Sequence, residues 1–389
     1  MSLDEQAKTR LAELDTRGLR RRVRPLADAH GPSIQVAGRS VVMLSSNDYL
    51  GLTSHPQLRA SLVRASRQWA TGAAASRLIS GTQRVHREAE ARLAKLTRTE
   101  RALLFSSGYA ANVGVLSSLP RAADVVFSDA LNHASIIDGC RLGKARVIVY
   151  PHADVDALTR LLEQHRSHHG AAFIVTDALF SMDGDRAPLG ALSELSARFD
   201  ASLIVDEAHS LGVLGPAGAG ACAEAGVTPE LLVGTLGKAL GLWGAFAAST
   251  PSVIELLENS ARSFVFSTAT SPAGAAACVV ACDLVQAADD ARARVLRYAT
   301  RLRDGLRSRG WRVPAGDAQI VPVVIGPADV TMQISSALFE RGFFVQGIRP
   351  PTVPQGTSRL RLAPMATHSD SMIEGVLAAF RDLERLRPS

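Results

Sequence analysis

The stretch ASLIVDEAHSLGVLG, residues 201–215, decides the fold of this chain, because an uninterrupted apolar run ends there in an acid and a polar turn. A run of the same kind, AAFIVTDALF, occupies residues 171–180, and the helix-like segment ALSELSARF lies between the two at 191–199. Continuous β-branched runs are typical of strands that are buried on both faces of a parallel sheet. Two such runs joined by a helix therefore predict parallel strands with a helix packed on the sheet.

The same alternation extends outward in both directions along the chain. Further strand-like runs occur at 102–105, 124–129, 145–150, 231–236 and 245–250. We predict from this pattern an α/β fold with one large domain over residues 45–280, built on a mostly parallel sheet. Residues 1–44 are predicted to carry a helix and a short hairpin, and residues 281–389 to form a smaller C-terminal α+β domain.

Composition narrows the class of protein. The chain has 389 residues, of which 47% are hydrophobic and 21% are charged, and this mix excludes a disordered, collagen-like or coiled-coil protein. The net charge is 43 − 37 = +6, yet only four of the 43 basic residues are lysines. So large an excess of arginine indicates the coding bias of a GC-rich genome, and we expect no nucleic-acid partner.

The cysteines and the N-terminus indicate the compartment. The four cysteines contain no Cys-x-x-Cys pair, so they suggest neither a disulfide framework nor a zinc site. Residues 1–22 form a charged amphipathic segment that does not resemble a signal peptide. The longest uncharged stretch, residues 263–282, contains Ser, Thr, Pro and Gly and is too polar to span a bilayer. We therefore expect a cytoplasmic protein with no membrane partner and no metal.

Ligands of open parallel sheets bind beyond the carboxyl ends of the strands, which makes Asp206 a candidate site residue. Asp206 ends the run SLIVD, and His209 follows three positions later. The acid could belong to a structural pair, to an ATPase, or to a site that binds a pyridine nitrogen. An ATPase needs the pattern Gly-x4-Gly-Lys-Ser/Thr. The Gly-Lys pairs at 143–144 and 237–238 are each followed by alanine and lack the first glycine, so this class is excluded.

Lys238 stands apart from the other lysines, because it lies in the stretch GTLGKALGLWG at 234–244, which holds no other charge. An ammonium group is costly to remove from water, and burial lowers the pKa of a lysine. A lysine in such a place can form a Schiff base with an aldehyde. A lysine that extends to the surface is the alternative.

Asp206, His209 and Lys238 together are the groups that pyridoxal 5'-phosphate (PLP) needs at one end of its ring. The lysine forms the imine, and the acid keeps the ring nitrogen protonated so that the ring accepts electrons. The histidine can form a hydrogen bond with the phenolic oxygen. The combination therefore favours a PLP site over three unrelated structural residues.

Two further features fit the rest of the cofactor. FSSGYAAN at 105–112 follows a strand and opens a helix, so the amides of Gly108 and Tyr109 can bind a phosphate at the helix N-terminus. His133 follows the next strand-like run and can stack on the ring. A turn of this kind, or a histidine after a strand, more often has only a structural role. Each supports a PLP site only in combination with the other residues.

The motifs that carry these residues resemble those of the α-oxoamine synthases, PLP enzymes of the fold type I, aspartate aminotransferase-like class. The resemblance runs in order from about Gly18 to the C-terminus. It rests on SSNDYLGL (45–52), LLFSSGYAAN (103–112), NHASIIDGCR (132–141), FSMDGD (180–185), LIVDEAHSLGVLG (203–215), TLGKALG (235–241) and IRPPTVPQGTSRLRL (348–362).

The resemblance implies an enzyme that condenses an amino acid with an acyl thioester and releases CO2. It also implies a homodimer with active sites at the subunit interface. The motif RPPTVPQGTSRLRL and the N-terminal cluster GLRRR favour the family member that joins L-alanine to a pimeloyl thioester, on CoA or acyl carrier protein, in biotin biosynthesis. A solvated helix face is the alternative for the basic cluster. Family members that act on other substrates, such as glycine C-acetyltransferase, 5-aminolevulinate synthase and serine palmitoyltransferase, are the first alternative. A non-catalytic protein of the same fold is the second.

The resemblance implies cofactor roles position by position. Lys238 matches the Schiff-base lysine, Asp206 the ring-nitrogen acid and His209 the phenolate partner. His133 matches the ring-stacking histidine, which also touches substrate. Three residues match phosphate contacts: Gly108, Tyr109 and Thr235. Ser181 matches a hydroxyl on the cofactor side.

Substrate roles follow in the same way. Arg361 matches the arginine that clamps the amino-acid carboxylate, and Asn47 matches a residue near the same group. Arg20 and Thr352 match contacts to the acyl substrate. Asp177 stands where relatives often have Glu, which could alter a contact to the thioester.

Tyr109 is a second departure, because some relatives have Phe at this position. Its hydroxyl needs a hydrogen-bond partner if it is buried.

Overall fold

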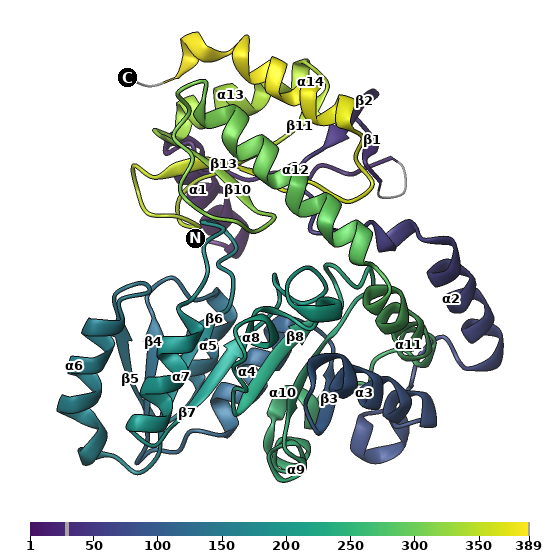
Figure 1. Ribbon diagram of the computed structural model, residues 1–389, viewed down its shortest axis with the longest axis vertical. Coiled ribbons are helices and arrows are strands. Elements are labelled where there is room, and N and C mark those ends of the chain that lie inside the picture. Colours follow the sequence, from purple (N-terminus) through teal and green to yellow (C-terminus); the bar gives the residue numbers. More distant parts are fainter. Residues whose placement is uncertain (28–30, 388–389) are drawn as a thin grey trace. The chain divides into compact units, whose positions relative to one another are not determined.

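The computed structural model describes residues 1–27 and 31–387, which form two compact units (Figure 1). The large unit comprises residues 47–181 and 185–294, and the small unit comprises residues 1–46, 182–184 and 295–389. Each unit has its own sheet system and its own core.

The large unit is built on a seven-stranded sheet in the order β3-β9-β8-β7-β6-β4-β5. All its neighbouring strands pair in parallel except at β9, which runs antiparallel to β3 and to β8. The predicted mostly parallel sheet is therefore confirmed. The strands are β3 (Arg101–Phe105), β4 (Val125–Asp129), β5 (Arg146–Tyr150), β6 (Ala172–Asp177), β7 (Ala201–Asp206), β8 (Leu231–Thr235) and β9 (Ala245–Ser249).

Helices connect and cover these strands (Figure 1). Alternate strand residues such as Val175, Ile204 and Val233 face a core shared with the helices α4, α5, α9 and α10, as the two-residue period of a strand requires. The helices are α2 (Pro56–Gln68), α3 (Arg84–Thr97), α4 (Gly108–Ser118), α5 (Ala134–Leu142), α6 (Val155–His165), α7 (Leu189–Arg198), α8 (Ala221–Glu224), α9 (Pro251–Ser260), α10 (Arg262–Val265) and α11 (Pro272–Gln286).

Helices α4 and α5, which begin beside the candidate site, pack unusually closely. A Cβ atom at Gly139 on α5 would lie 2.9 Å from the carbonyl oxygen of Asn112 and 3.0 Å from Cβ of Leu116, both on α4. Only glycine allows this approach without a shift of backbone. The two helices are therefore in close contact at Gly139.

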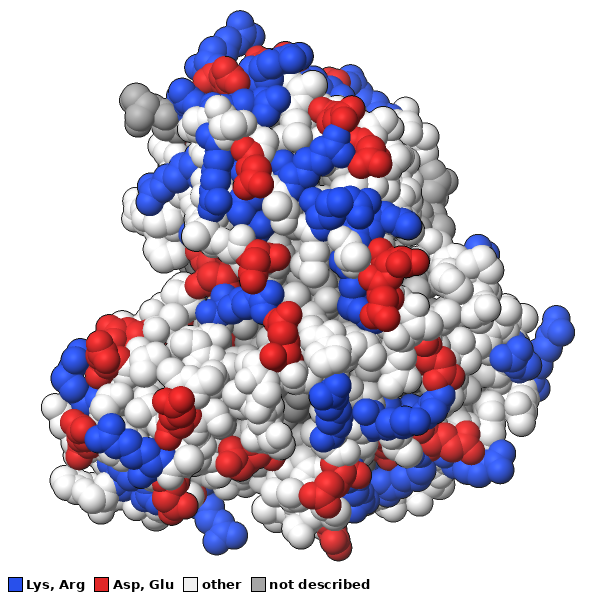
Figure 2. Space-filling view, viewed as in Figure 1, with Lys and Arg blue, Asp and Glu red and all other residues white. Residues whose placement is uncertain are grey.

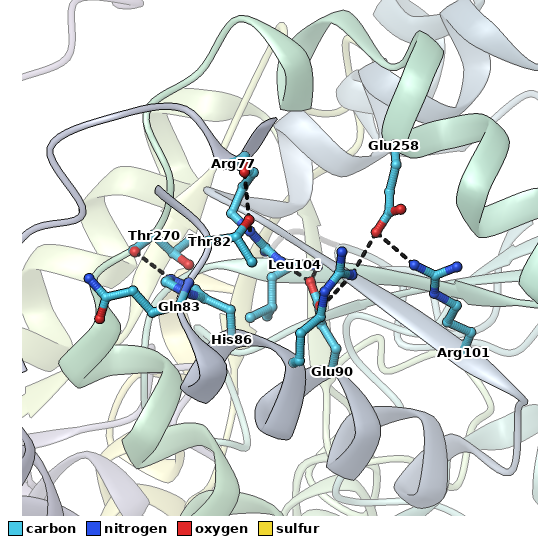
Figure 3. Close-up of polar contacts among 10 residues, drawn as sticks. Arg77, Thr82, Gln83, His86, Glu90, Arg101, Leu104, Glu258 and Thr270 are labelled. Carbon is cyan, nitrogen blue, oxygen red and sulfur yellow. Dashed lines mark hydrogen bonds and ion pairs between the residues drawn. The ribbon is translucent and has the colours of Figure 1, made fainter. Parts of the chain in front are cut away.

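An ion-pair cluster joins α3 and α9 to the edge strand β3 (Figure 3). Glu90 on α3 is 3% exposed. It accepts hydrogen bonds from Arg77 Nη1 at 2.9 Å and from the backbone N–H of Leu104 at 3.0 Å. Glu258 on α9 accepts a hydrogen bond from Arg101 Nη2 at 2.9 Å. Because the buried Glu90 carboxylate is paired with Arg77, loss of either partner would leave an uncompensated charge at the edge of the sheet.

The small unit combines two three-stranded sheets, in the orders β1-β2-β11 and β10-β13-β12. Helix α12 (Asp289–Arg307) enters it from the large unit. The remaining elements are α1 (Leu3–Thr16), β1 (Ser33–Val36), β2 (Arg39–Met43), β10 (Val321–Gly326), α13 (Ala328–Glu340), β11 (Phe343–Phe344), β12 (Gln346–Ile348), β13 (Ser358–Leu362) and α14 (Asp370–Arg381).

The N-terminal segment belongs with the C-terminal residues and does not form a unit of its own. The predicted hairpin is present as β1 and β2, and β2 pairs in parallel with β11 through Val42 and Phe343. Leu44 is fully buried in the core formed by α12, α13 and α14. The unit boundaries lie at 46/47 and 294/295, compared with the 44/45 and 280/281 that the sequence predicted. Helix α11 stays in the large unit because it packs on α2 and α3.

Charged side chains of both signs are interspersed on the face of each unit that Figure 2 shows. Within residues 1–27 and 31–387, no helix combines the length and the apolar character that a membrane span needs.

Candidate active site

Lys238 lies in a tight turn that follows β8. The Thr235 side chain shapes this turn, because its hydroxyl donates to the carbonyl of Gly244 at 3.1 Å and accepts from the backbone N–H of Gly237 at 3.2 Å. Gly241 closes the turn with a φ of +68°, and a Cβ atom there would meet the backbone of Leu52 at 2.6 Å. Lys238 itself is half-buried. The backbone of the turn is thus determined by the neighbours of the lysine, Thr235 and Gly241.

Asp206 lies at the carboxyl end of β7, as predicted, and its side chain is held from two sides. The residue is 5% exposed. Its Oδ1 accepts from the backbone N–H of Ala208 at 2.8 Å, and its Oδ2 accepts from Asn112 Nδ2 at 2.6 Å. Asn112 lies one turn into α4, so this contact connects the acid to the helix that starts at Gly108. Each carboxylate oxygen keeps a lone pair that can accept a further hydrogen bond.

His209 is oriented by a buried tyrosine. The Tyr49 hydroxyl lies 2.6 Å from His209 Nδ1, and it donates to Asn47 Oδ1 at 3.2 Å. Tyr49 has no exposed surface and His209 is 5% exposed. The motif SSNDYLGL therefore contacts His209, the predicted partner of the cofactor phenolate, through Tyr49, a residue to which the sequence assigned no role.

His133 caps the N-terminus of α5 and is fixed in one tautomer. Its Nδ1 accepts from the backbone N–H of Ser135 at 3.2 Å and lies 2.7 Å from Ser135 Oγ. Ser135 Oγ in turn accepts from Asn112 Nδ2 at 2.9 Å. Because Nδ1 acts as an acceptor, a neutral His133 carries its proton on Nε2. A chain of side-chain contacts thus joins His133 to Asp206 through Ser135 and Asn112.

The surroundings favour the neutral form of His133. Burial lowers the pKa of His133; the Asp206 carboxylate opposes that shift, and the positive charge of Lys238 adds to it. A neutral imidazole with an Nε2–H can donate one hydrogen bond and can stack on an aromatic ring.

Asp177 lies at the end of β6, opposite Asp206 in the strand register. It is 4% exposed, and its Oδ2 accepts from the backbone N–H of His133 at 2.7 Å. Burial and the nearby Asp206 charge raise the pKa of Asp177 well above its usual value. The structure therefore shows that this residue positions the His133 turn, and its contact to a thioester stays a prediction.

Helix α4 begins at Gly108, as predicted, and its first turn offers free donors. Ser107 caps the helix by accepting from the backbone N–H of Ala110 at 3.1 Å. The backbone N–H groups of Gly108 and Tyr109 have no acceptor among the described residues. The Tyr109 side chain is half-exposed, so its hydroxyl does not need a protein partner, but it donates to Asp138 Oδ2 at 2.8 Å.

The donor set of the large unit fits PLP. The lysine amine matches the aldehyde, and the buried Asp206 carboxylate matches the pyridine nitrogen. The two histidines match the ring and its phenolic oxygen. The N-terminus of α4, with its free N–H groups, matches the phosphate. The large unit also contains Ser181, at the point where the chain leaves that unit, and Asn47, next to Tyr49. The cofactor roles of these residues stay predictions.

The predicted substrate residues Arg20, Thr352 and Arg361 lie in the small unit. Arg20 and Thr352 line a cavity of about 590 Å³ whose walls combine several arginines with apolar side chains. Arg21 Nη2 donates to Thr352 Oγ1 at 2.9 Å, and Arg349 Nη2 donates to the carbonyl of Arg20 at 2.7 Å. Arg361 lies on the central strand β13 and is 6% exposed.

Comparisons with known proteins agree with this geometry. The family model for aminotransferase class I and II matches residues 39–380. The 8-amino-7-oxononanoate synthase of Geobacter sulfurreducens is 49% identical over 95% of each chain. The enzyme of the same name from Anaeromyxobacter dehalogenans is 48% identical over 95% of this chain and 93% of its own.

Solved structures show the same fold. The serine palmitoyltransferase of Sphingomonas wittichii is 31% identical, covers 100% of both chains and superposes with a TM-score of 0.93. The 8-amino-7-oxononanoate synthase of Francisella tularensis is 27% identical over 89% of this chain and 98% of its own, with a TM-score of 0.76. A further serine palmitoyltransferase structure, 29% identical, contains PLP. This chain belongs to the aminotransferase class I and II family of PLP-dependent enzymes and, within it, to the 8-amino-7-oxononanoate synthases.

Proposed function

We propose that this enzyme condenses L-alanine with a pimeloyl thioester to give 8-amino-7-oxononanoate, CO2 and a free thiol in biotin biosynthesis. The observation that carries the proposal is the 46–49% identity, over at least 92% of this chain, to relatives named for that product. The solved structures named for palmitoyl transfer are 29–31% identical and the one named for this product is 27% identical, so the curated relatives, and not the solved structures, favour this product.

The residues of the large unit supply the proton chemistry. When bound, PLP withdraws the electron pair that the amino-acid α-carbon gains on losing a proton or a carboxylate. Lys238 would remove the α-proton at Nζ and return a proton to the product. Asp206 would hold a proton on the pyridine nitrogen, and Asn112 keeps the Asp206 carboxylate oriented for that purpose. His133 would donate from Nε2, since its Nδ1 already accepts.

The residues of the small unit are proposed to bind the two substrates. Arg361 would bind the alanine carboxylate through its two parallel N–H groups. The cavity that includes Arg20 and Thr352 would take the acyl donor, because its walls offer apolar contacts from Met332 and Ile348 as well as cationic groups. A pimeloyl thioester combines an aliphatic chain with an anionic end, and it matches both kinds of wall.

The working form that we propose is a cytoplasmic homodimer, and exposed apolar side chains support the dimer. Leu78, Ile79 and Phe266 are 53%, 82% and 72% exposed. They lie in neighbouring segments, because Ser76 and Thr268 form a β-bridge. Exposed apolar patches of this kind mark association surfaces. Sedimentation of the PLP-loaded protein should give twice the chain mass, and a monomer at assay concentration would contradict this part of the proposal.

Thiol release tests the substrate assignment. The PLP-loaded enzyme is given L-alanine with pimeloyl-CoA, L-alanine with pimeloyl-acyl carrier protein, glycine with acetyl-CoA, or L-serine with palmitoyl-CoA. We expect release only in the presence of L-alanine and a pimeloyl donor, and the two pimeloyl arms identify the carrier. Faster release with glycine and acetyl-CoA would make glycine C-acetyltransferase the correct function, and faster release with serine and palmitoyl-CoA would make it a serine palmitoyltransferase.

A further inference from the structure

His152 lies between two carboxylates at the carboxyl edge of the large sheet. It follows β5, with Nδ1 2.9 Å from Asp129 Oδ1 and Nε2 2.7 Å from Asp185 Oδ2. The Phe180 ring packs edge-on against the imidazole, with ring centroids 4.3 Å apart. These partners come from two chain segments, because Asp129 is the last residue of β4 and Phe180 and Asp185 follow β6. His152 contacts both segments.

Asp129 organises the turn that carries His133. Its Oδ1 also accepts a hydrogen bond from the backbone N–H of Leu131 at 2.8 Å. Its backbone carbonyl oxygen accepts one from the backbone N–H of Asn132 at 3.2 Å. Asp129 is 2% exposed. On the β4 side, His152 therefore contacts Asp129, the first residue of the turn that ends at His133.

Asp185 closes the loop that begins at Ser181. Its carbonyl oxygen accepts from the backbone N–H of Phe180 at 3.0 Å, and Leu179 and Arg186 form an antiparallel bridge beside it. The chain leaves the large unit after Ser181 and returns to it at Asp185. On the other side, His152 therefore contacts Asp185, which ends the loop that begins at Ser181.

The contacts require a doubly protonated ring. A neutral imidazole has a single N–H and would present a lone pair to one of the two carboxylates. Burial lowers the pKa of His152, but the hydrogen bonds to Asp129 and Asp185 outweigh it and raise the pKa to about 10. The imidazolium thus forms two charge-assisted hydrogen bonds, which are shorter and stronger than neutral ones.

We propose that His152 is a positioning residue that holds the His133 turn and the Ser181 loop at one spacing around the cofactor. This inference rests on the proposed cofactor contacts of His133 and Ser181, and it adds a residue that makes no contact with the cofactor itself. Without the imidazolium, Asp129 and Asp185 repel each other and the two segments move apart.

Two variants and a matched control test the proposal in the PLP-loaded enzyme. His152→Gln removes the charge and keeps a polar side chain, and Asp185→Asn removes one carboxylate of the pair. Glu258→Gln is the control, because it also removes an ion pair with arginine in the large unit but lies in the cluster of α3, α9 and β3. For each protein we would measure PLP affinity, the visible circular dichroism of the bound cofactor, kcat, KM for alanine and the unfolding temperature.

We expect His152→Gln to weaken PLP binding and to lower kcat, each by about 10-fold or more, because a small displacement of positioned groups has effects of this size. KM for alanine should change much less, and the visible circular dichroism should fall. The double variant with Asp185→Asn should be no worse than His152→Gln alone, since His152→Gln has already removed the contact to Asp185. Glu258→Gln should lower only the unfolding temperature.

The proposal is overturned if His152→Gln behaves like Glu258→Gln, with a lower unfolding temperature but unchanged PLP affinity, dichroism and kcat. It is also overturned if the effects of His152→Gln and Asp185→Asn simply add. A wrong substrate assignment would not affect the test of His152, because PLP affinity and the visible circular dichroism are measured without substrate. If the parent enzyme releases no thiol from any substrate pair, these two measurements still decide the role of His152.

Discussion

Lys238 occupies a turn whose backbone is held by Thr235 and Gly241, so truncation of its side chain removes chemistry and little packing. We predict that Lys238→Ala lowers thiol release by at least about 10³-fold, because a covalent and proton-transferring group is lost. The unfolding temperature of the cofactor-free protein should stay within a few degrees of the parent. Borohydride reduction of the PLP-loaded parent should label Lys238. A variant with near-normal turnover, or labelling at another residue, would contradict the assignment.

Tyr49 orients His209, because its hydroxyl lies 2.6 Å from His209 Nδ1. Tyr49→Phe preserves the buried ring and leaves His209 without this partner. We expect PLP affinity and kcat to fall by about 10-fold, as for other residues that orient a directly bonding histidine. Tyr298→Phe is the control, because it also removes a buried hydroxyl hydrogen bond, to the carbonyl of His368 at 3.1 Å, but in the small unit. Equal effects of the two variants on PLP affinity would argue against a role for Tyr49.

At the scale of elements, His368 joins the hairpin strand β2 to the segment before α14. Its Nδ1 accepts from the backbone N–H of Met365 at 2.9 Å, and its Nε2 donates to the carbonyl of Met43 at 2.9 Å. Burial lowers the pKa of His368 to about 4, although the bond to Met43 opposes this shift. The unfolded chain, with a pKa near 6.5, therefore binds the proton first as the pH falls.

The His368 contribution to stability is complete above about pH 6.5 and disappears as the pH falls toward 4. We predict that this residue alone lowers the free energy of unfolding by up to about 3 kcal/mol across that window. Denaturant unfolding of the parent and of His368→Gln, at pH 7.5 and at pH 5, measures the effect. The variant should be less stable at pH 7.5 and should depend less on pH. An equal pH dependence in both proteins would show that His368 is not the responsible group.

At the scale of the whole molecule, the proposed cofactor residues lie in the large unit and Arg20, Thr352 and Arg361 lie in the small one. Variants in the small unit should therefore impair substrate binding and leave cofactor binding intact. We predict that Arg361→Ala raises KM for alanine by about 10-fold or more, because a bidentate ion pair is lost. Arg361→Lys keeps the charge but loses the two-pronged geometry, and should recover only part of the affinity.

Thr352→Ala should raise KM for the pimeloyl donor and leave KM for alanine unchanged, since Thr352 lines the arginine-rich cavity. All three variants should bind PLP with parental affinity. Loss of PLP affinity in Arg361→Lys or in Thr352→Ala would contradict the proposed division of roles.

The amino-acid sequence by itself determined the α/β class, the mostly parallel sheet and the positions of Asp206, Lys238 and Gly108 at strand and helix ends. These features depend on local patterns, because burial of a strand on both faces and the start of a helix are visible in neighbouring residues. The family followed from ordered motifs, which the comparisons confirm.

Only the tertiary structure decided which residues orient the site. Tyr49 and His209 are 160 positions apart, and Asn112 and Asp206 are 94 apart, so no local pattern connects them. The same holds for His152 with Asp185 and for the union of residues 1–46 with the C-terminal core. Hydrogen bonds and apolar contacts act over a few ångströms in space, and the folded chain alone brings such distant residues within that range.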